Sequence, residues 1–287
     1  MRNRKTLAAA KPLSLVQKNS LIYDDAHCHL QDARLAPWLD ESRDSLDASE
    51  IRRRVVNGTQ PSDWESVLFL GNEFESVIPS IGLHPWYVNT VGDDWKAAFE
   101  KHIDTGKCAV GEIGLDRWIE NHDTEAQKDA FLFQFRRARE AELPISIHCL
   151  RAWGLLLELL EKEGPYEPGF LLHSYGGPRE MIESFVALGA RFSFSGYFAV
   201  KGKRKKRDAF LAVPWDRLLI ETDAPDMLGP EPLRAESAYD SEGEAINSPN
   251  NLIKIYDFVA QMRGVAVEEL TAIVDANFRA LFRLWEN

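Results

Sequence analysis

What this sequence has little of narrows its class. It holds three cysteines among 287 residues, and their spacing is not that of a zinc finger. So sparse and odd a set argues against a secreted disulfide scaffold and favours a reducing, cytoplasmic compartment. The longest apolar run, residues 153–157, is broken at Glu158 and is far shorter than the roughly 20 residues of a membrane-spanning helix. The sequence therefore predicts neither an extracellular protein nor a membrane protein.

Positive charge is also scarce, because 34 lysines and arginines face 45 acidic residues, for a formal net charge of −11. A protein that grips duplex DNA by broad phosphate neutralisation is usually basic. A nucleic-acid substrate would therefore have to be held locally, through metals and a small basic patch. Residues 1–20 are the exception, since they carry five basic residues and no acidic one. They could form an organelle-targeting segment, but few serines and no cleavage pattern favour a flexible basic extension.

The rest of the chain, residues 21–287, alternates strand and helix patterns without a linker or repeat, which predicts a single domain. Strands are expected from residue 21 and at 53–59, 76–84, 108–113, 144–148, 169–173, 191–195 and 217–222. Helices are expected from 61 and 248, and at 93–104, 124–142, 153–161, 178–188 and 267–285. Residues 32–50 and 228–246 are typical of connections, the first with one helical turn. Eight such units predict an α/β fold, a (β/α)8 barrel, for which about 250 residues is typical.

A pair of histidines at the end of the first expected strand is the first chemical signal. Successive side chains of a strand point to opposite faces, so His27 and His29 share a face while Cys28 points away. Two imidazoles on one face supply half of a tetrahedral or octahedral metal site. The alternative is a pair of strand-end histidines that meet solvent or cap a carbonyl.

Further metal-ligating side chains follow the later strands. Glu112 ends the fourth, His148 the fifth and His173 the sixth, and Asp223 follows the eighth. Each could instead be structural, as an ion-paired acid or a satisfied core histidine. Together they would meet at the C-terminal mouth of a barrel, where ligands bind. A cation there would offset the desolvation of the carboxylates, so the set predicts a metal site.

The same residues carry a family resemblance. Five ordered blocks, residues 25–30, 82–85, 111–116, 144–148 and 221–225, resemble the signature blocks of the TatD family of metal-dependent hydrolases, which belong to the amidohydrolase-type barrels. The resemblance runs from Asp25 to the C-terminus and includes Asn250 and residues 277–279.

This resemblance implies a deoxyribonuclease of the 3′→5′ exonuclease type with two divalent metal ions, acting on single-stranded DNA ends. It assigns His27 and His29 to the first metal, Glu112 as the bridge, His148 and His173 to the second metal, and Asp223 as a ligand of the first and the base for water. Such imidazole-rich ligands suit Zn, Mn, Ni or Fe better than Mg, which water could still assist. His84 would stand beside the substrate phosphate.

The chain departs from the family blocks at two places. The family often has an arginine two residues after the fifth-strand histidine, whereas Arg151 stands three residues after His148. Its guanidinium is thus a displaced candidate for substrate contact. Residues 173–177, His-Ser-Tyr-Gly-Gly, replace the common His-Cys-Phe-Ser-Gly, which leaves the histidine in place and alters the substrate wall.

A basic run at residues 201–207 follows the seventh expected strand, close to the mouth. Lys203 and Arg204 within it are candidates for contact with a nucleic-acid backbone. The alternative is a solvated start of a helix. Cys28 and Cys149, each beside a candidate ligand, are expected to be buried structural thiols.

Two other functions compete with the nuclease hypothesis. The same site could serve an amidohydrolase or deacylase acting on a small molecule or an aminoacyl-tRNA, which the acidic charge favours slightly. The barrel could also have lost catalysis and serve as a binding protein, although the presence of all six ligand types argues against this.

Overall fold

The computed structural model describes residues 21–283, and eight parallel strands form a nearly closed barrel in chain order. The strands are β1 (Tyr23–Cys28), β2 (Ile51–Asn57), β3 (Val77–Ile81), β4 (Ala109–Asp116), β5 (Ile145–Leu150), β6 (Phe170–Leu172), β7 (Ala190–Phe194) and β8 (Leu218–Ile220). The predicted (β/α)8 barrel is therefore confirmed. All eight carboxyl ends lie at one mouth, which is where the predicted ligands follow their strands.

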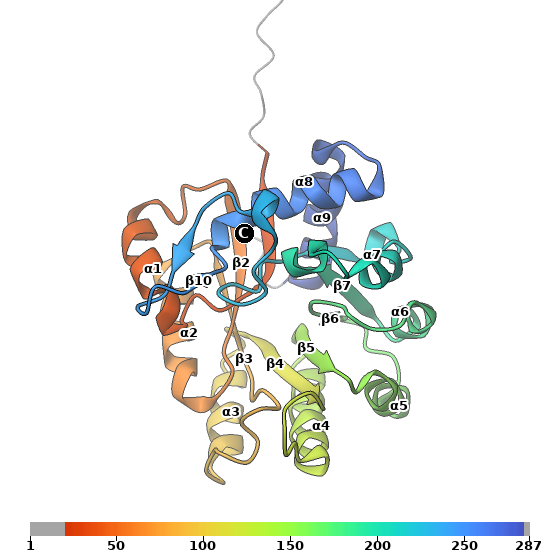
Figure 1. Cartoon of the computed structure of the whole chain (residues 1–287). Helices are drawn as coiled ribbons and strands as arrows, with labels where there is room; N and C mark the ends of the chain where they lie inside the picture. Colours follow the sequence, from red (N-terminus) through yellow and green to blue (C-terminus); the bar gives the residue numbers. More distant parts are fainter. Residues whose placement is uncertain (1–20, 284–287) are drawn as a thin grey trace, which may run out of the picture.

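Helices surround the strands on the outside of the barrel (Figure 1). They are α1 (Ala36–Ser42), α2 (Pro61–Glu73), α3 (Trp95–Ile103), α4 (Thr124–Glu140), α5 (Trp153–Glu163), α6 (Ile182–Ala187), α7 (Arg204–Phe210), α8 (Leu252–Arg263) and α9 (Val267–Leu281). The longest, α4, begins where the Asp123 carboxylate caps the amide of Ala126. Its Phe131, Phe135 and Ala138 are buried at helical spacing against the barrel.

The ends of β8 and β1 are joined by hydrogen bonds to a buried carboxylate and to the backbone. The buried Asp25 carboxylate accepts hydrogen bonds from the Thr222 amide (2.9 Å) and hydroxyl (2.6 Å). Just beyond the end of β8, the Asp223 amide donates to the His27 carbonyl at 2.9 Å. These bonds fix the relative position of the two strand ends that carry His27 and Asp223.

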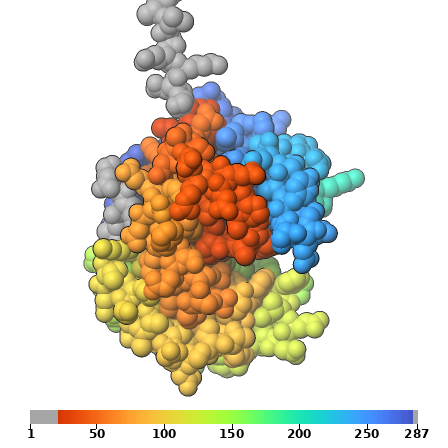
Figure 2. Space-filling view, turned by 90° about the vertical axis from the view of Figure 1, so that its left-hand side faces the viewer, coloured from red at the N-terminus to blue at the C-terminus, as the bar shows by residue number. Residues whose placement is uncertain are grey.

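Two segments expected as connections are more structured than the sequence indicated. Residues 32–50 contain α1, which buries Trp38, and residues 228–246 contain the antiparallel pair β9 (Ala238–Tyr239) and β10 (Ala245–Ile246). The β9–β10 segment lies beside α1 (Figures 1 and 2). There the Trp38 indole donates to the Glu236 carboxylate at 3.1 Å. Tertiary contacts, rather than local periodicity, therefore order both segments.

Two expectations concern the ends of the chain. The basic extension at residues 1–20 and the last four residues lie outside the described part. Within residues 21–283, none of the helices has the combination of length and apolar character needed to span a bilayer.

Candidate metal centre

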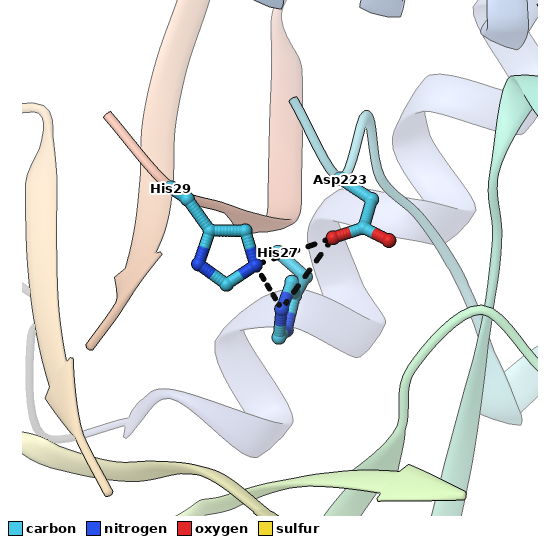
Figure 3. Close-up of side chains that lie close together, drawn as sticks. All are labelled: His27, His29 and Asp223. Atoms are coloured by element: carbon cyan, nitrogen blue, oxygen red, sulfur yellow. Dashed lines mark hydrogen bonds and ion pairs between the residues drawn. The ribbon is translucent and has the colours of Figure 1, made fainter. Parts of the chain in front are cut away.

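Two neighbouring strand ends bring three of the predicted ligands together. His27 lies near the end of β1, His29 follows that strand, and Asp223 follows β8 with a left-handed φ of 57°. The Asp223 Oδ1 atom lies 3.4 Å from His29 Nε2 and 3.8 Å from His27 Nε2. The three heads face one another in Figure 3. They could hold a metal ion together.

Glu112 of β4 joins this group to a second one. Its Oε2 atom lies 3.3 Å from His27 Nε2 and 3.5 Å from His29 Nε2. Its Oε1 atom lies 2.7 Å from both His148 Nδ1 and His173 Nε2. The two oxygens of one buried carboxylate therefore face two different pairs of imidazoles. The structure thus brings all six predicted metal-ligand side chains into one cluster at the mouth.

The outward nitrogens of these imidazoles are held by oxygens. His29 Nδ1 lies 2.7 Å from the Asn57 carbonyl, and His148 Nε2 lies 3.0 Å from the Asp116 carboxylate. A carbonyl and a carboxylate can only accept, so these nitrogens carry the protons and the opposite nitrogens offer lone pairs to the cluster. Metal-ligating histidines almost always have such partners. This arrangement fits a bound cation.

Two carboxylates in this outer set, Asp116 and Glu221, were not given roles from the sequence. Asp116 is fully buried behind His148, and Glu221 is fully buried with its Oε1 3.6 Å from His173 Nδ1. The other Glu221 oxygen accepts from the Ser193 hydroxyl at 2.5 Å. Strand alternation held a signal for Asp116, because it lies four residues after Glu112 on the same face of β4.

His84 lies in the loop after β3 and touches the same cluster. Its Nδ1 accepts a hydrogen bond from the Trp86 amide at 3.2 Å, and its Nε2 lies 3.4 Å from Glu112 Oε1. Burial lowers the pKa of His84 to about 4. The ring is therefore neutral near pH 7, with its proton on Nε2, facing the centre of the cluster.

The charges of the cluster point to a need for cations. Burial alone would raise the pKa of Glu112, but His173, His84 and His27 hold it well below its usual range. Burial would lower the pKa of His29, yet Asp223 and Glu112 outweigh it and raise the pKa to about 9. Ionised carboxylates here thus require adjacent positive charge, which protons or divalent cations can supply.

The predicted substrate contacts lie outside the cluster. Arg151 is exposed just after β5, and Arg204 is exposed at the start of α7, where it pairs with Asp208 at 3.6 Å. Lys203 places its ammonium 4.4 Å from the centre of the Tyr197 ring. All three follow strand ends at the mouth side of the barrel. Their contact with substrate stays a prediction.

The two predicted structural thiols are buried. Cys28 and Cys149 are both free, and burial raises the pKa of each. The Cys28 thiol lies 3.5 Å from the Val55 carbonyl, on the side of β1 away from the cluster. Neither thiol is reactive in such surroundings.

A parallel barrel whose mouth holds a buried cluster of imidazoles and carboxylates defines a metal-dependent hydrolase. Comparison with known proteins agrees: the family model described as TatD related DNase matches residues 24–283. This chain belongs to the TatD family of metal-dependent hydrolases.

Named relatives span most of the chain. The uncharacterized metal-dependent hydrolase YcfH of Escherichia coli is 30% identical over 266 residues, which cover 91% of this chain and 95% of the relative. The 3′-5′ ssDNA/RNA exonuclease TatD of Escherichia coli is 31% identical over 235 residues, or 79% and 86% of the two chains. The crystal structure of YJJV, a TatD homologue of Escherichia coli, superimposes with a TM-score of 0.81 at 24% identity, covering 91% of this chain and 98% of that one. The last likeness concerns the fold.

Proposed function

We propose that this chain hydrolyses phosphodiester bonds at the 3′ ends of single-stranded nucleic acid, with two divalent cations held by the cluster. In this proposal His27, His29 and Asp223 hold one cation. His148 and His173 hold the other, and Glu112 contributes one oxygen to each. The metal is Zn, Mn, Ni or Mg, with the imidazole-rich ligand set favouring the transition metals.

The observation that carries the proposal is the division of Glu112 between two imidazole pairs. Its Oε2 faces His27 and His29, whereas its Oε1 faces His148 and His173. A carboxylate that bridges two cations has this disposition and limits their mutual repulsion. Two cations at such a site supply charge for an in-line displacement, because they acidify the attacking water and neutralise the leaving oxygen.

The side chains of the cluster would then handle protons and orientation. Water attacks the phosphorus, the bond to the leaving nucleotide oxygen breaks, and Asp223 accepts the proton of the water. His84 donates its Nε2 proton in a hydrogen bond to a phosphate oxygen, because its Nδ1 is occupied by the Trp86 amide. The burial of both side chains keeps bulk water from competing for these bonds.

The choice of a nucleic-acid substrate rests on the relatives and on local charge. Relatives at 31% identity are named as ssDNA/RNA exonucleases. The basic run at residues 201–207 is tied to the mouth, since the Lys206 ammonium donates to the Gly176 carbonyl in the loop after β6. Exposed lysine and arginine side chains of this run can therefore reach a phosphate backbone near the cluster despite the net charge of −11.

A labelled oligonucleotide tests the proposal. Single-stranded DNA labelled at its 5′ end should shorten progressively from the 3′ end when Mn²⁺ or Zn²⁺ is present, and it should remain intact with chelator. RNA of the same sequence and duplex DNA define the substrate range. Glu112→Ala should lose both activity and metal, because it removes a ligand of both cations. Intact single strands after incubation with metal-loaded wild-type protein would contradict the proposal.

A second candidate is an amidohydrolase or deacylase acting on a small molecule or an aminoacyl-tRNA. The net charge of −11 favours it, because such substrates need little phosphate neutralisation. Metal-dependent release of amino acid from aminoacyl-tRNA, with no shortening of single-stranded DNA, would decide for this candidate.

A further inference from the structure

An exposed tryptophan stands directly beside the candidate metal centre. The side chain of Trp86 is 44% exposed, although it lies only two residues after the buried His84. Its ring meets the His84 ring edge to face, with the centroids 5.0 Å apart. A large apolar surface is thus left open to solvent one side chain away from Glu112.

This exposed ring is also held firmly in place. The Trp86 indole Nε1 donates a hydrogen bond of 2.8 Å to Oδ2 of Asp116, which is fully buried. The same oxygen lies 3.0 Å from His148 Nε2. One carboxylate therefore orients both a candidate metal ligand and the exposed ring. An exposed aromatic fixed by its polar edge presents a ready face at little cost in conformational entropy.

The geometry points to a nucleobase-stacking function for Trp86, resting on the proposed nuclease activity: the ring stacks on a base next to the scissile phosphate. A base is joined to its phosphate by one sugar, so a phosphate bound at His84 brings a neighbouring base within reach of the ring. Bases stack on aromatic side chains in most single-strand binding sites. A stacked base would supply affinity that the acidic surface of this chain withholds.

Two substitutions separate stacking from the anchoring hydrogen bond. Trp86→Phe and Trp86→Leu both remove the indole N–H that Asp116 accepts, but only phenylalanine keeps an aromatic face. Any disturbance of His148 through Asp116 is then common to both variants. Trp215→Leu is the matched control, because Trp215 is 38% exposed just before β8, at the opposite end of the barrel.

The probes are two single-stranded thymidylate oligonucleotides with phosphorothioate linkages that slow hydrolysis. One is complete, and the other lacks the bases of its two 3′-terminal nucleotides. Binding to the metal-loaded protein is measured by fluorescence anisotropy, and KM and kcat are measured on the cleavable versions.

The complete strand should bind Trp86→Leu about 5- to 150-fold more weakly than Trp86→Phe, the range expected for one stacked base. The loss should appear in KM more than in kcat. The strand lacking bases should not distinguish the two variants, and Trp215→Leu should behave as wild type on both strands. Equal affinity of the two Trp86 variants for the complete strand, or equal losses on both strands, would overturn the stacking function while wild-type cleavage leaves the nuclease function standing. Wild-type protein that neither binds nor cleaves either strand overturns both.

Discussion

Replacing Asp116 by asparagine tests whether the outer carboxylates set the tautomers of the metal-site histidines. Oδ2 of Asp116 accepts from His148 Nε2 (3.0 Å) and Trp86 Nε1 (2.8 Å), and its Oδ1 accepts from the Trp118 amide (2.6 Å). Three donors thus converge on two oxygens. An asparagine has one oxygen, so its NH₂ group must face either the Trp118 amide or the pair formed by His148 and Trp86.

The second arrangement keeps the backbone bond and has a chemical consequence. With an NH₂ group opposite Nε2, His148 must move its proton to Nδ1, the nitrogen that lies 2.7 Å from Glu112. That nitrogen then offers no lone pair to a cation. Loss of such an outer partner typically lowers metal affinity by about 10- to 100-fold, or about 1.4–2.7 kcal/mol. We expect this loss for one cation, on the His148 side of Glu112.

Calorimetric titration of metal-free protein with Zn²⁺ or Mn²⁺ measures the effect. Wild type should show two binding events, and Asp116→Asn should weaken one of them by the factor above while leaving the other. Asp123→Asn is the control, because Asp123 caps α4 away from the cluster and asparagine caps a helix equally well. Two unaltered affinities in Asp116→Asn would refute the tautomer argument.

Three further predictions concern the base, the basic run and a distant ion-pair cluster. Asp223→Asn should lower turnover on single-stranded substrate by about 10²–10⁴, as for a lost general base, with the cation between His148 and His173 retained; wild-type turnover with metals in place would be evidence against that assignment. Serine at three exposed or half-buried basic residues should flatten the salt dependence of oligonucleotide binding by about 0.7 for each phosphate that the variant no longer neutralises, and an unchanged slope would show a solvated surface; these residues are Lys203, Arg204 and Lys205. Burial opposes ionisation of Asp275, but its arginine neighbours hold its pKa below the usual range, so its contribution is present above the unfolded pKa of about 3.9 and lost as pH falls through the folded value. Asp275→Asn should therefore lower the free energy of unfolding by about 1 kcal/mol at pH 7 and by less at pH 3 in urea titrations, and an equal difference at both pH values would contradict this sign.

Much of the barrel could be predicted because its strands carry their own signal. Segments such as residues 145–150 combine β-branched or apolar residues with a polar strand end, and α4 shows Phe131, Phe135 and Ala138 at helical spacing. The short pair β9–β10 carried no such pattern, since strands of two residues are defined by their partner. Helix α1 was also missed, although Pro37 in its first turn was a usable signal.

The inner side chains of the candidate site were predictable for a different reason than the outer ones. His27 and His29 occupy one face of a strand end, and that placement follows from alternation alone. The functions of Asp116 and Glu221 depend on which imidazole each one meets, across pairs of strands that the sequence does not align residue by residue. Trp86 likewise gains meaning only when its indole is seen to reach Asp116 from the β3 loop.

The most direct test of the central claim is a crystal structure of the Mn²⁺-loaded protein with anomalous diffraction recorded at the manganese edge. The account predicts two anomalous peaks about 3.5–4 Å apart, one on each side of the Glu112 carboxylate, with His27 and His29 at one peak and His148 and His173 at the other. A single peak, or two peaks that do not share Glu112, would contradict it.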